Sequence, residues 1–284
     1  MYKKILALSV AGLLLFSCSD TEMADSNPTE TQIKNDPALT SLGLKITADK
    51  SGVNIFENID FKLSQKNQST YFGILADYLD VLTFKISNTE GEKIIFEKTQ
   101  NGNSVTTSFN YHFYYPGNYT VSIEGFKDGK KIYTDQTSVN VTDNNDFLAV
   151  NWNGFTATDT ATGYNNILQK NTLGFFNGFE NQHPYVLVTN IWDNMYSYTD
   201  TQIKQMDKEY LYNYLAKYYS APTYSEGNTD MKDRYTQNFK KSIKNDIPVN
   251  IWITTKSKIA LMKQYSSTDP SLFIGYIVIA EPNN

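Results

Sequence analysis

Few side chains in this 284-residue chain are of the types that perform covalent or metal chemistry. The chain holds one cysteine, Cys18, and two histidines, His112 and His183. A serine–histidine–acid triad on a Gly-x-Ser-x-Gly elbow is excluded, because that motif is absent. Two separated histidines and one cysteine also fall short of a nitrogen- and sulfur-ligated zinc site. The sequence therefore predicts no metal site and no cysteine-based catalysis.

Nucleotide cofactors and nucleic acid are equally poor candidates as ligands. The chain has neither the phosphate-cradling Gly-x-x-x-x-Gly-Lys motif nor the dinucleotide motif Gly-x-Gly-x-x-Gly, so no cofactor is expected. Arg234 is the only arginine, and the formal net charge is −5. Because arginine is the preferred partner of phosphate and guanine, the composition predicts no nucleic-acid binding.

Paired carboxylates are the one catalytic device that the composition permits. Glu180, Asp193 and Asp200 flank the ends of an apolar run over residues 185–192. A glycosidase places two such acids about 5–9 Å apart. A carboxylate-dependent hydrolase of polysaccharide is therefore an alternative hypothesis, although any acidic domain contains some pair of this kind.

Aromatic side chains are the stronger anomaly, at 14% of the residues with 21 tyrosines. Five of them surround the end of the same apolar run and the helix expected after it: Trp192, Tyr196, Tyr198, Tyr219 and Tyr224. Flat rings with a polar handle suit both sugar stacking and protein interfaces. The alternative is that tyrosine simply fills core and surface positions in this chain.

The N-terminus explains the lone cysteine. Lys3 and Lys4 precede an apolar run over residues 5–16, which is too short to span a bilayer and reads as a secretory signal. The run ends in Leu15-Phe16-Ser17-Cys18, which resembles a bacterial lipobox. That resemblance implies a signal peptide over residues 1–17 and a lipidated Cys18 that anchors the protein to a membrane.

Residues 18–40 are expected to form a flexible acidic tether. They hold five acidic residues against Lys34 alone, a formal charge of −4. An acidic stretch after a lipidated cysteine resembles the surface-export signal of Bacteroidetes lipoproteins. The resemblance implies an outer-membrane location, with the protein facing outward.

Residues 41–143 alternate apolar and polar side chains in short runs, for example over residues 59–63 and 81–86. This period and the turn signals between runs predict an all-β, immunoglobulin-like sandwich. The segment Tyr111 to Val121 contains an aromatic, Pro-Gly and Tyr-x-Val, and resembles the F strand of PKD-type domains. There Tyr119 is expected to bury its ring and bond the backbone at the corner.

Residues 144–284 predict a mixed α/β or α+β domain after a hinge over residues 141–146. Strands are expected over residues 147–152, 184–192, 249–254 and 272–280, and helices over residues 201–219, 230–245 and 257–265. The strand over residues 184–192 is nearly continuously apolar, so burial on both faces is expected.

These features together favour a cell-envelope lipoprotein whose C-terminal domain binds a glycan or a protein partner. The hydrolase described above is one alternative. A structural subunit of an outer-membrane complex is another, and it predicts a contiguous exposed apolar patch.

Overall fold

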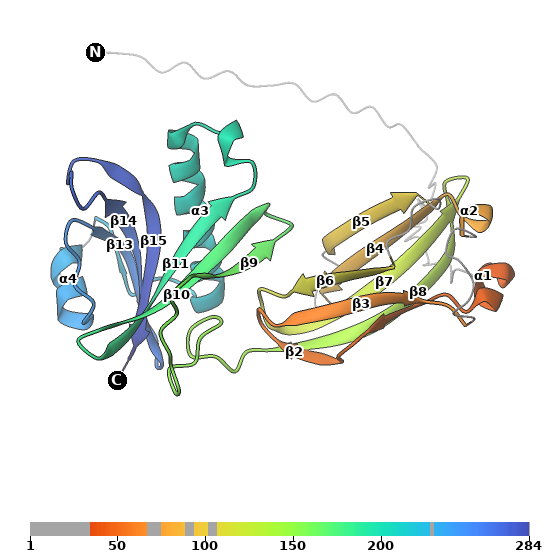
Figure 1. Cartoon of the computed structure of the whole chain (residues 1–284), viewed down its shortest axis with the longest axis horizontal. Coiled ribbons are helices and arrows are strands. Elements are labelled where there is room, and N and C mark those ends of the chain that lie inside the picture. The colour runs from red at the N-terminus through yellow and green to blue at the C-terminus, as the bar shows by residue number, and fades with distance from the viewer. Residues whose placement is uncertain (1–34, 67–74, 89–93, 102–106, 228–229, 284) are drawn as a thin grey trace, which may run out of the picture. The chain divides into compact units, whose positions relative to one another are not determined.

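The computed structural model describes residues 35–66, 75–88, 94–101, 107–227 and 230–283 (Figure 1). Cys18 and residues 1–17 lie outside the described residues, as does most of the expected tether. From residue 34 onward the chain forms one compact unit. Within the described part of the chain, no helix is long and apolar enough to cross a bilayer.

The first eight strands form two sheets. A three-stranded sheet has the order β1-β3-β6, with bounds Lys45–Ala48, Asn58–Ser64 and Ser108–His112. A five-stranded sheet has the order β2-β8-β7-β4-β5, with bounds Gly52–Asn54, Lys130–Thr142, Gly117–Lys127, Val81–Asn88 and Ile94–Asn101. Two short helices accompany them, α1 (Pro37–Leu42) and α2 (Leu75–Tyr78). Helix α1 begins inside the stretch expected as tether, and its Leu39 is fully buried.

Alternating side chains of the two sheets meet in one hydrophobic core. On β3, Ile59, Phe61 and Leu63 are buried, and the residues between them are exposed. On β4, Leu82, Phe84 and Ile86 point into the same core. The period of two read from the sequence is therefore confirmed here, and the protein is β-rich with several sheets.

The Pro-Gly-Asn-Tyr segment forms the corner that leads into β7. Gly117 has a φ of 149°, a value that favours glycine because it has no Cβ. The Tyr119 ring is buried, and its hydroxyl donates to the Tyr115 carbonyl over 2.7 Å. Both expectations for Tyr119 are confirmed. His112 is also structural, because its Nδ1 lies 3.0 Å from the Phe56 carbonyl.

The second half of the chain is built on one antiparallel seven-stranded sheet of order β12-β13-β14-β15-β11-β10-β9 (Figure 1). In chain order its strands are β9 (Thr162–Asn166), β10 (Asn171–Glu180), β11 (His183–Trp192), β12 (Tyr224–Ser225), β13 (Ile247–Ile253), β14 (Ser257–Tyr265) and β15 (Phe273–Pro282). The helices are α3 (Asp200–Tyr219) and α4 (Met231–Asn238), with a short 3₁₀ turn, η2, at Met195–Ser197.

Helices α3 and α4 cover opposite faces of this sheet. On β15, Val278 and Ala280 belong to the core that contains Leu211 of α3. The intervening Ile277 and Ile279 pack in a second cluster with residues of α4. Successive side chains of a strand point to opposite faces, so a strand covered by a helix on each side is apolar throughout.

This double coverage explains an error in the sequence-based prediction. Residues 257–265 were expected to form a helix, but they form β14, an interior strand of the sheet. All of Ile259 to Met262 is buried, because alternate residues face α3 and α4. A continuous apolar run of this length does not distinguish a buried strand from a buried helix.

Other expected elements differ in extent or type. Residues 147–152 form a tight turn closed by bonds between Phe147 and Val150, not a strand, and Leu148 has a φ of 44°. Helix α4 ends at Asn238, so the helix expected over residues 230–245 is about half as long. Strand β11 was expected to be buried on both faces, but only Val186 and Val188 are buried. Helix α4 lies over β12 and β13, so the face of β11 on the α4 side is partly open.

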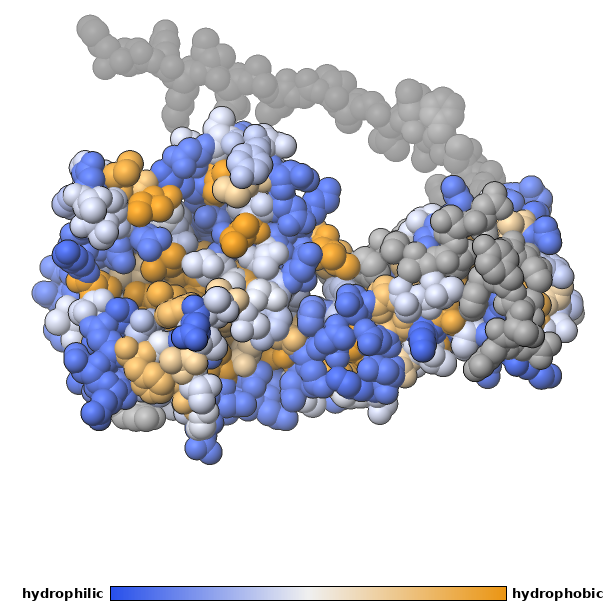
Figure 2. All heavy atoms as spheres, viewed as in Figure 1, coloured by the Kyte–Doolittle hydropathy of each residue, from blue (hydrophilic) through white to orange (hydrophobic). Residues whose placement is uncertain are grey.

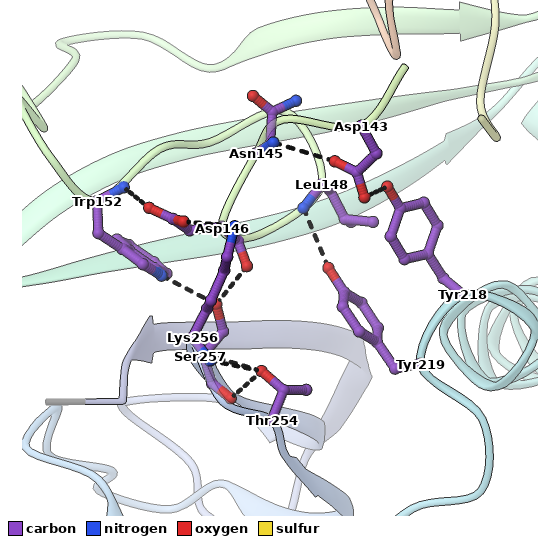
Figure 3. Close-up of polar contacts among 10 residues, drawn as sticks. All are labelled: Asp143, Asn145, Asp146, Leu148, Trp152, Tyr218, Tyr219, Thr254, Lys256 and Ser257. Carbon is purple, nitrogen blue, oxygen red and sulfur yellow. Dashed lines mark hydrogen bonds and ion pairs between the residues drawn. The ribbon is translucent and has the colours of Figure 1, made fainter. Parts of the chain in front are cut away.

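The turn that follows β8 is fastened to the second half of the chain (Figure 3). The hydroxyl of Tyr218 bonds the carboxylate of Asp143, and Leu148 donates its backbone N–H to the Tyr219 hydroxyl over 3.1 Å. Ser257 is fully buried: it accepts from the Trp152 indole over 2.9 Å and donates to the Asp146 carbonyl over 2.6 Å. The expected hinge is thus a hydrogen-bonded connection.

Candidate functional site

An open hollow of about 360 Å³ lies beside α3. Helix α3 supplies six of its lining side chains, because positions three, four, seven, eight and eleven residues apart share one helix face. Its first turn is held by a capping box between Thr199 and Gln202. The lining residues are Tyr115, Gln169, Trp192, Met206, Glu209, Tyr210, Asn213, Tyr214 and Lys217.

Four aromatic rings and Met206 make up the apolar part of the hollow. Trp192 meets Tyr210 edge to face, with ring centroids 5.6 Å apart and planes at 72°. Tyr210 and Tyr214 lie parallel at 6.1 Å, and Tyr214 is 5.3 Å from Tyr115. Burial raises the pKa of Tyr210 and Tyr214, so both hydroxyls stay protonated at neutral pH. The Tyr214 hydroxyl donates to the Tyr114 carbonyl over 3.2 Å, and the Tyr210 hydroxyl accepts from the Asn166 amide over 3.1 Å.

A buried polar network holds the rings in place from below. Asp207 is 7% exposed, and its Oδ1 accepts from the Trp192 indole over 2.7 Å and from the Asn190 amide over 2.9 Å. Asn171 on the neighbouring strand β10 donates in turn to Asn190. Burial raises the pKa of Asp207, and the two hydrogen bonds partly oppose that rise. The plane of the Trp192 ring is therefore set by side chains of α3, β10 and β11 together.

Polar groups line the rest of the hollow. Lys217 holds its ammonium 3.9 Å from the centroid of the Tyr115 ring, which is a cation–π contact. Glu209 accepts from Gln205 over 2.5 Å on the helix surface. Gln169 and Asn213 add amide groups. The hollow therefore presents hydrogen-bond donors and acceptors, and one charge of each sign, around its rings.

The aromatic residues predicted from sequence do not share one surface. Trp192 lines the hollow, but Tyr196 and Tyr198 follow it in the loop before α3, 98% and 43% exposed. The Tyr219 hydroxyl is occupied by the backbone of Leu148. Tyr224 lies on β12 and packs with the cluster under α4, with Arg234 5.0 Å over its ring.

Of the three predicted acids, Glu180 lies far from Asp193. In the β10–β11 pair, Glu180 is opposite His183 at one end and Asn171 is opposite Trp192 at the other. Ten residues at about 3.3 Å each put Glu180 about 30 Å along the sheet from Asp193. Glu180 bonds Lys241 and Ser242, whereas Asp200 pairs with Lys204 one turn along α3. Glu180 and Asp193 therefore cannot act as the two acids of one site.

The chemistry open to the hollow is recognition by ring stacking and hydrogen bonding. Glu209 is the one carboxylate among its lining residues, all of which the structure describes. A mechanism that needs two flanking carboxylates would lack its second member there. Over the described residues, no cluster of three or more metal-ligating side chains is present.

Several residues of this site were not predicted from the sequence. Tyr115, Gln169 and Asp207 come from three distant segments, and nothing local marks them as neighbours of Trp192. A partial signal existed for α3, where Met206, Tyr210 and Tyr214 share one stripe. That stripe proves to be the wall of the hollow rather than only a core face.

Comparison with known proteins does not assign a family. No family model matches the chain, and no curated protein matches it. Among solved structures, one assigned as a thioesterase II from Thermobifida fusca YX aligns at 6% identity. The alignment covers 88% of this chain and 98% of that one, with a TM-score of 0.16. A similarity this low carries no argument about fold or function.

Proposed function

We propose that this protein is a cell-envelope lipoprotein that binds a glycan in the hollow beside α3. The observation that carries the proposal is the grouping of Tyr115, Trp192, Tyr210 and Tyr214 around one open cavity with polar side chains at its edge. Sugar rings present apolar C–H faces and equatorial hydroxyls. Aromatic faces match the former, and amide, carboxylate and ammonium groups match the latter.

The scaffold of the hollow supports binding rather than turnover. The Trp192 indole is held by Asp207, which Asn190 fixes in turn, so little rotamer freedom is lost when a ligand stacks on the ring. Tyr115 is supplied by the corner before β7, where the Tyr119 hydroxyl bonds its carbonyl. Binding would therefore use a preformed surface built from both halves of the chain.

The proposed role of the N-terminal half is to hold the hollow away from the membrane. We propose that residues 41–143 are an immunoglobulin-like sandwich, supported by the two sheets that share a core and by the tyrosine corner at Tyr119. Lipidation at Cys18, followed by the acidic stretch over residues 18–40, would present the hollow away from the outer membrane on the cell surface. Replacing Cys18 by serine should release the protein from the membrane fraction and abolish labelling by palmitate.

The binding proposal is tested with residues 19–284, purified without the anchor. A glycan array covering envelope and plant polysaccharides identifies a ligand, and titration calorimetry gives its affinity. Trp192→Ala should weaken that affinity about tenfold or more, since a central aromatic anchor contributes over 1 kcal/mol. Phe179→Ala is the matched control, because Phe179 is a 49% exposed aromatic at the other end of the sheet. Absence of any glycan ligand, or an affinity that survives Trp192→Ala, would contradict the proposal.

A further inference from the structure

Large exposed apolar side chains gather at one end of the seven-stranded sheet. The described residues contain nine such side chains, and eight of them lie at this end. Ile167 and Leu168 are in the β9–β10 turn, and Leu272 and Ile274 are at the start of β15. The other four belong to the end of β11 and the loop to α3: Ile191, Met195, Tyr196 and Tyr198. We call these eight residues the apolar end.

The three segments of the apolar end are bonded to one another. The Asp193 N–H donates to the Lys170 carbonyl over 2.7 Å, which joins the loop after β11 to the β9–β10 turn. Lys204 of α3 donates to the Phe273 carbonyl over 2.7 Å, which joins the start of α3 to the start of β15. Figure 1 places these turns at the upper end of the sheet, and Figure 2 shows apolar side chains exposed there.

Such a concentration is unusual for a surface that faces only water. Single exposed apolar residues are ordinary, but a group of them marks a surface that another molecule covers. The composition, with two tyrosines, a methionine and branched aliphatic residues, is that of the centre of a protein interface. Tyr196 is 98% exposed, so a partner that covers it would remove nearly all of its apolar area from water.

The charge around the apolar end selects among the molecules that could cover it. Its three segments and the first turn of α3 carry Asp193, Asp200 and Asp269 against Lys170 and Lys204, a formal charge of −1. Asp200 is paired with Lys204, which leaves Asp193 and Asp269 against Lys170. Hydrogen bonds from Ser271 lower the pKa of Asp269, which keeps it ionised at neutral pH. An anionic bilayer, a second copy of this surface and the chain's own acidic stretch over residues 18–40 would all meet like charge.

We infer that the apolar end is a docking surface for a partner protein whose contact face is apolar at its centre and rich in lysine or arginine at its rim. This proposal does not depend on the glycan proposal, because none of the eight side chains of the apolar end lines the hollow. A protein that holds a glycan at one site and an envelope partner at another would act as an adaptor between them.

The inference is tested with two synthetic amphipathic peptides of equal leucine content, one with lysine and one with glutamate at every polar position. Binding to residues 19–284 is followed by fluorescence anisotropy at low and physiological salt. The lysine peptide should bind and the glutamate peptide should not. The triple variant Leu168→Ser/Tyr196→Ser/Leu272→Ser should weaken binding of the lysine peptide about tenfold or more, and Phe179→Ser should leave it unchanged.

Three outcomes would overturn the inference. Equal binding of both peptides would show that charge does not select the partner, and an unchanged affinity in the triple variant would place binding elsewhere. Flotation of the protein with vesicles of anionic lipid, or its self-association in sedimentation, in a manner lost in the triple variant, would assign the surface to a bilayer or to a second copy. Circular dichroism of the triple variant checks that it is folded, as expected for three substitutions in exposed loops.

Discussion

Trp192 donates its indole N–H to the buried carboxylate of Asp207, 2.7 Å away. The same carboxylate oxygen accepts from Asn190, which lies two residues before Trp192 on β11. One acid on α3 therefore fixes two side chains on the strand beneath it. The strand presents them on the same face because they are two residues apart.

The position of Asp207 makes the stability of the protein depend on pH. Because burial raises its pKa in the folded state, folding favours the protonated form, and stability falls as pH rises from about 3.9, the unfolded value, through the raised folded value. Asp207→Asn cannot ionise and should lack this slope. Urea unfolding from pH 4 to 7 measures this slope. The free energy of unfolding of the wild type relative to that of the variant should decline as pH rises. A difference that does not change with pH would contradict a raised pKa for Asp207.

The opposite dependence of stability on pH is expected for Glu180. Hydrogen bonds from Lys241 and Ser242 lower its pKa to about 2. Its contribution to stability is therefore present above pH 4.5 and is lost as pH falls toward 2. Because solvent screens this pair, Glu180→Gln should lower the free energy of unfolding by only about 1 kcal/mol at pH 7, with the difference vanishing near pH 2. Asp200→Asn, at an exposed pair, is the control and should cost less than about 0.5 kcal/mol.

Removing one oxygen should measure how much the Tyr119 corner contributes to the free energy of unfolding. Tyr119→Phe keeps the buried ring but deletes the 2.7 Å bond to the Tyr115 carbonyl. A loss of about 1 kcal/mol in the free energy of unfolding is expected. Tyr196→Phe removes a hydroxyl from a 98% exposed side chain and should have no effect. Equal stabilities of the two variants would show that the corner bond contributes nothing.

The buried hydroxyl of Ser257 is the centre of the connection drawn in Figure 3. Ser257→Ala leaves the Trp152 indole N–H and the Asp146 carbonyl without the partner they have now. An uncompensated buried polar group costs about 1–3 kcal/mol, so thermal unfolding should show a loss of about 2 kcal/mol. Ser267→Ala, in an exposed turn, should be neutral. A neutral Ser257→Ala would mean that water replaces the hydroxyl.

Elements with a strong local signal were predictable. The strand over residues 59–63 alternates strictly, the strand over residues 81–86 alternates after one doubled apolar residue, and α3 carries a Thr199 cap and an apolar stripe. The Tyr119 corner was predictable because a short motif encodes it. In each case the stabilising contacts lie within a few residues, so the sequence alone displays them.

Strands β9 and β10 were not predicted, because their sequences carry little local strand signal. Thr162–Asn166 is polar, and Asn171–Glu180 contains two glycines and two asparagines, which weaken any strand pattern. Their pairing with each other and with β11 supplies the stability that local propensity lacks. Strand β14 was misread because its periodicity disappears when both faces are covered.

By itself the sequence determined the alternating strands of the first half, the extent of α3 and the corner at Tyr119, because period, cap and turn chemistry act over a few residues. Only the tertiary structure decided that residues 257–265 form an interior strand and that Tyr115, Trp192 and Tyr210 share one hollow. It also separated Glu180 from Asp193 along a single strand pair. The physical reason is that a site is assembled by contacts between distant segments, and those contacts depend on strand order and helix packing rather than on local pattern.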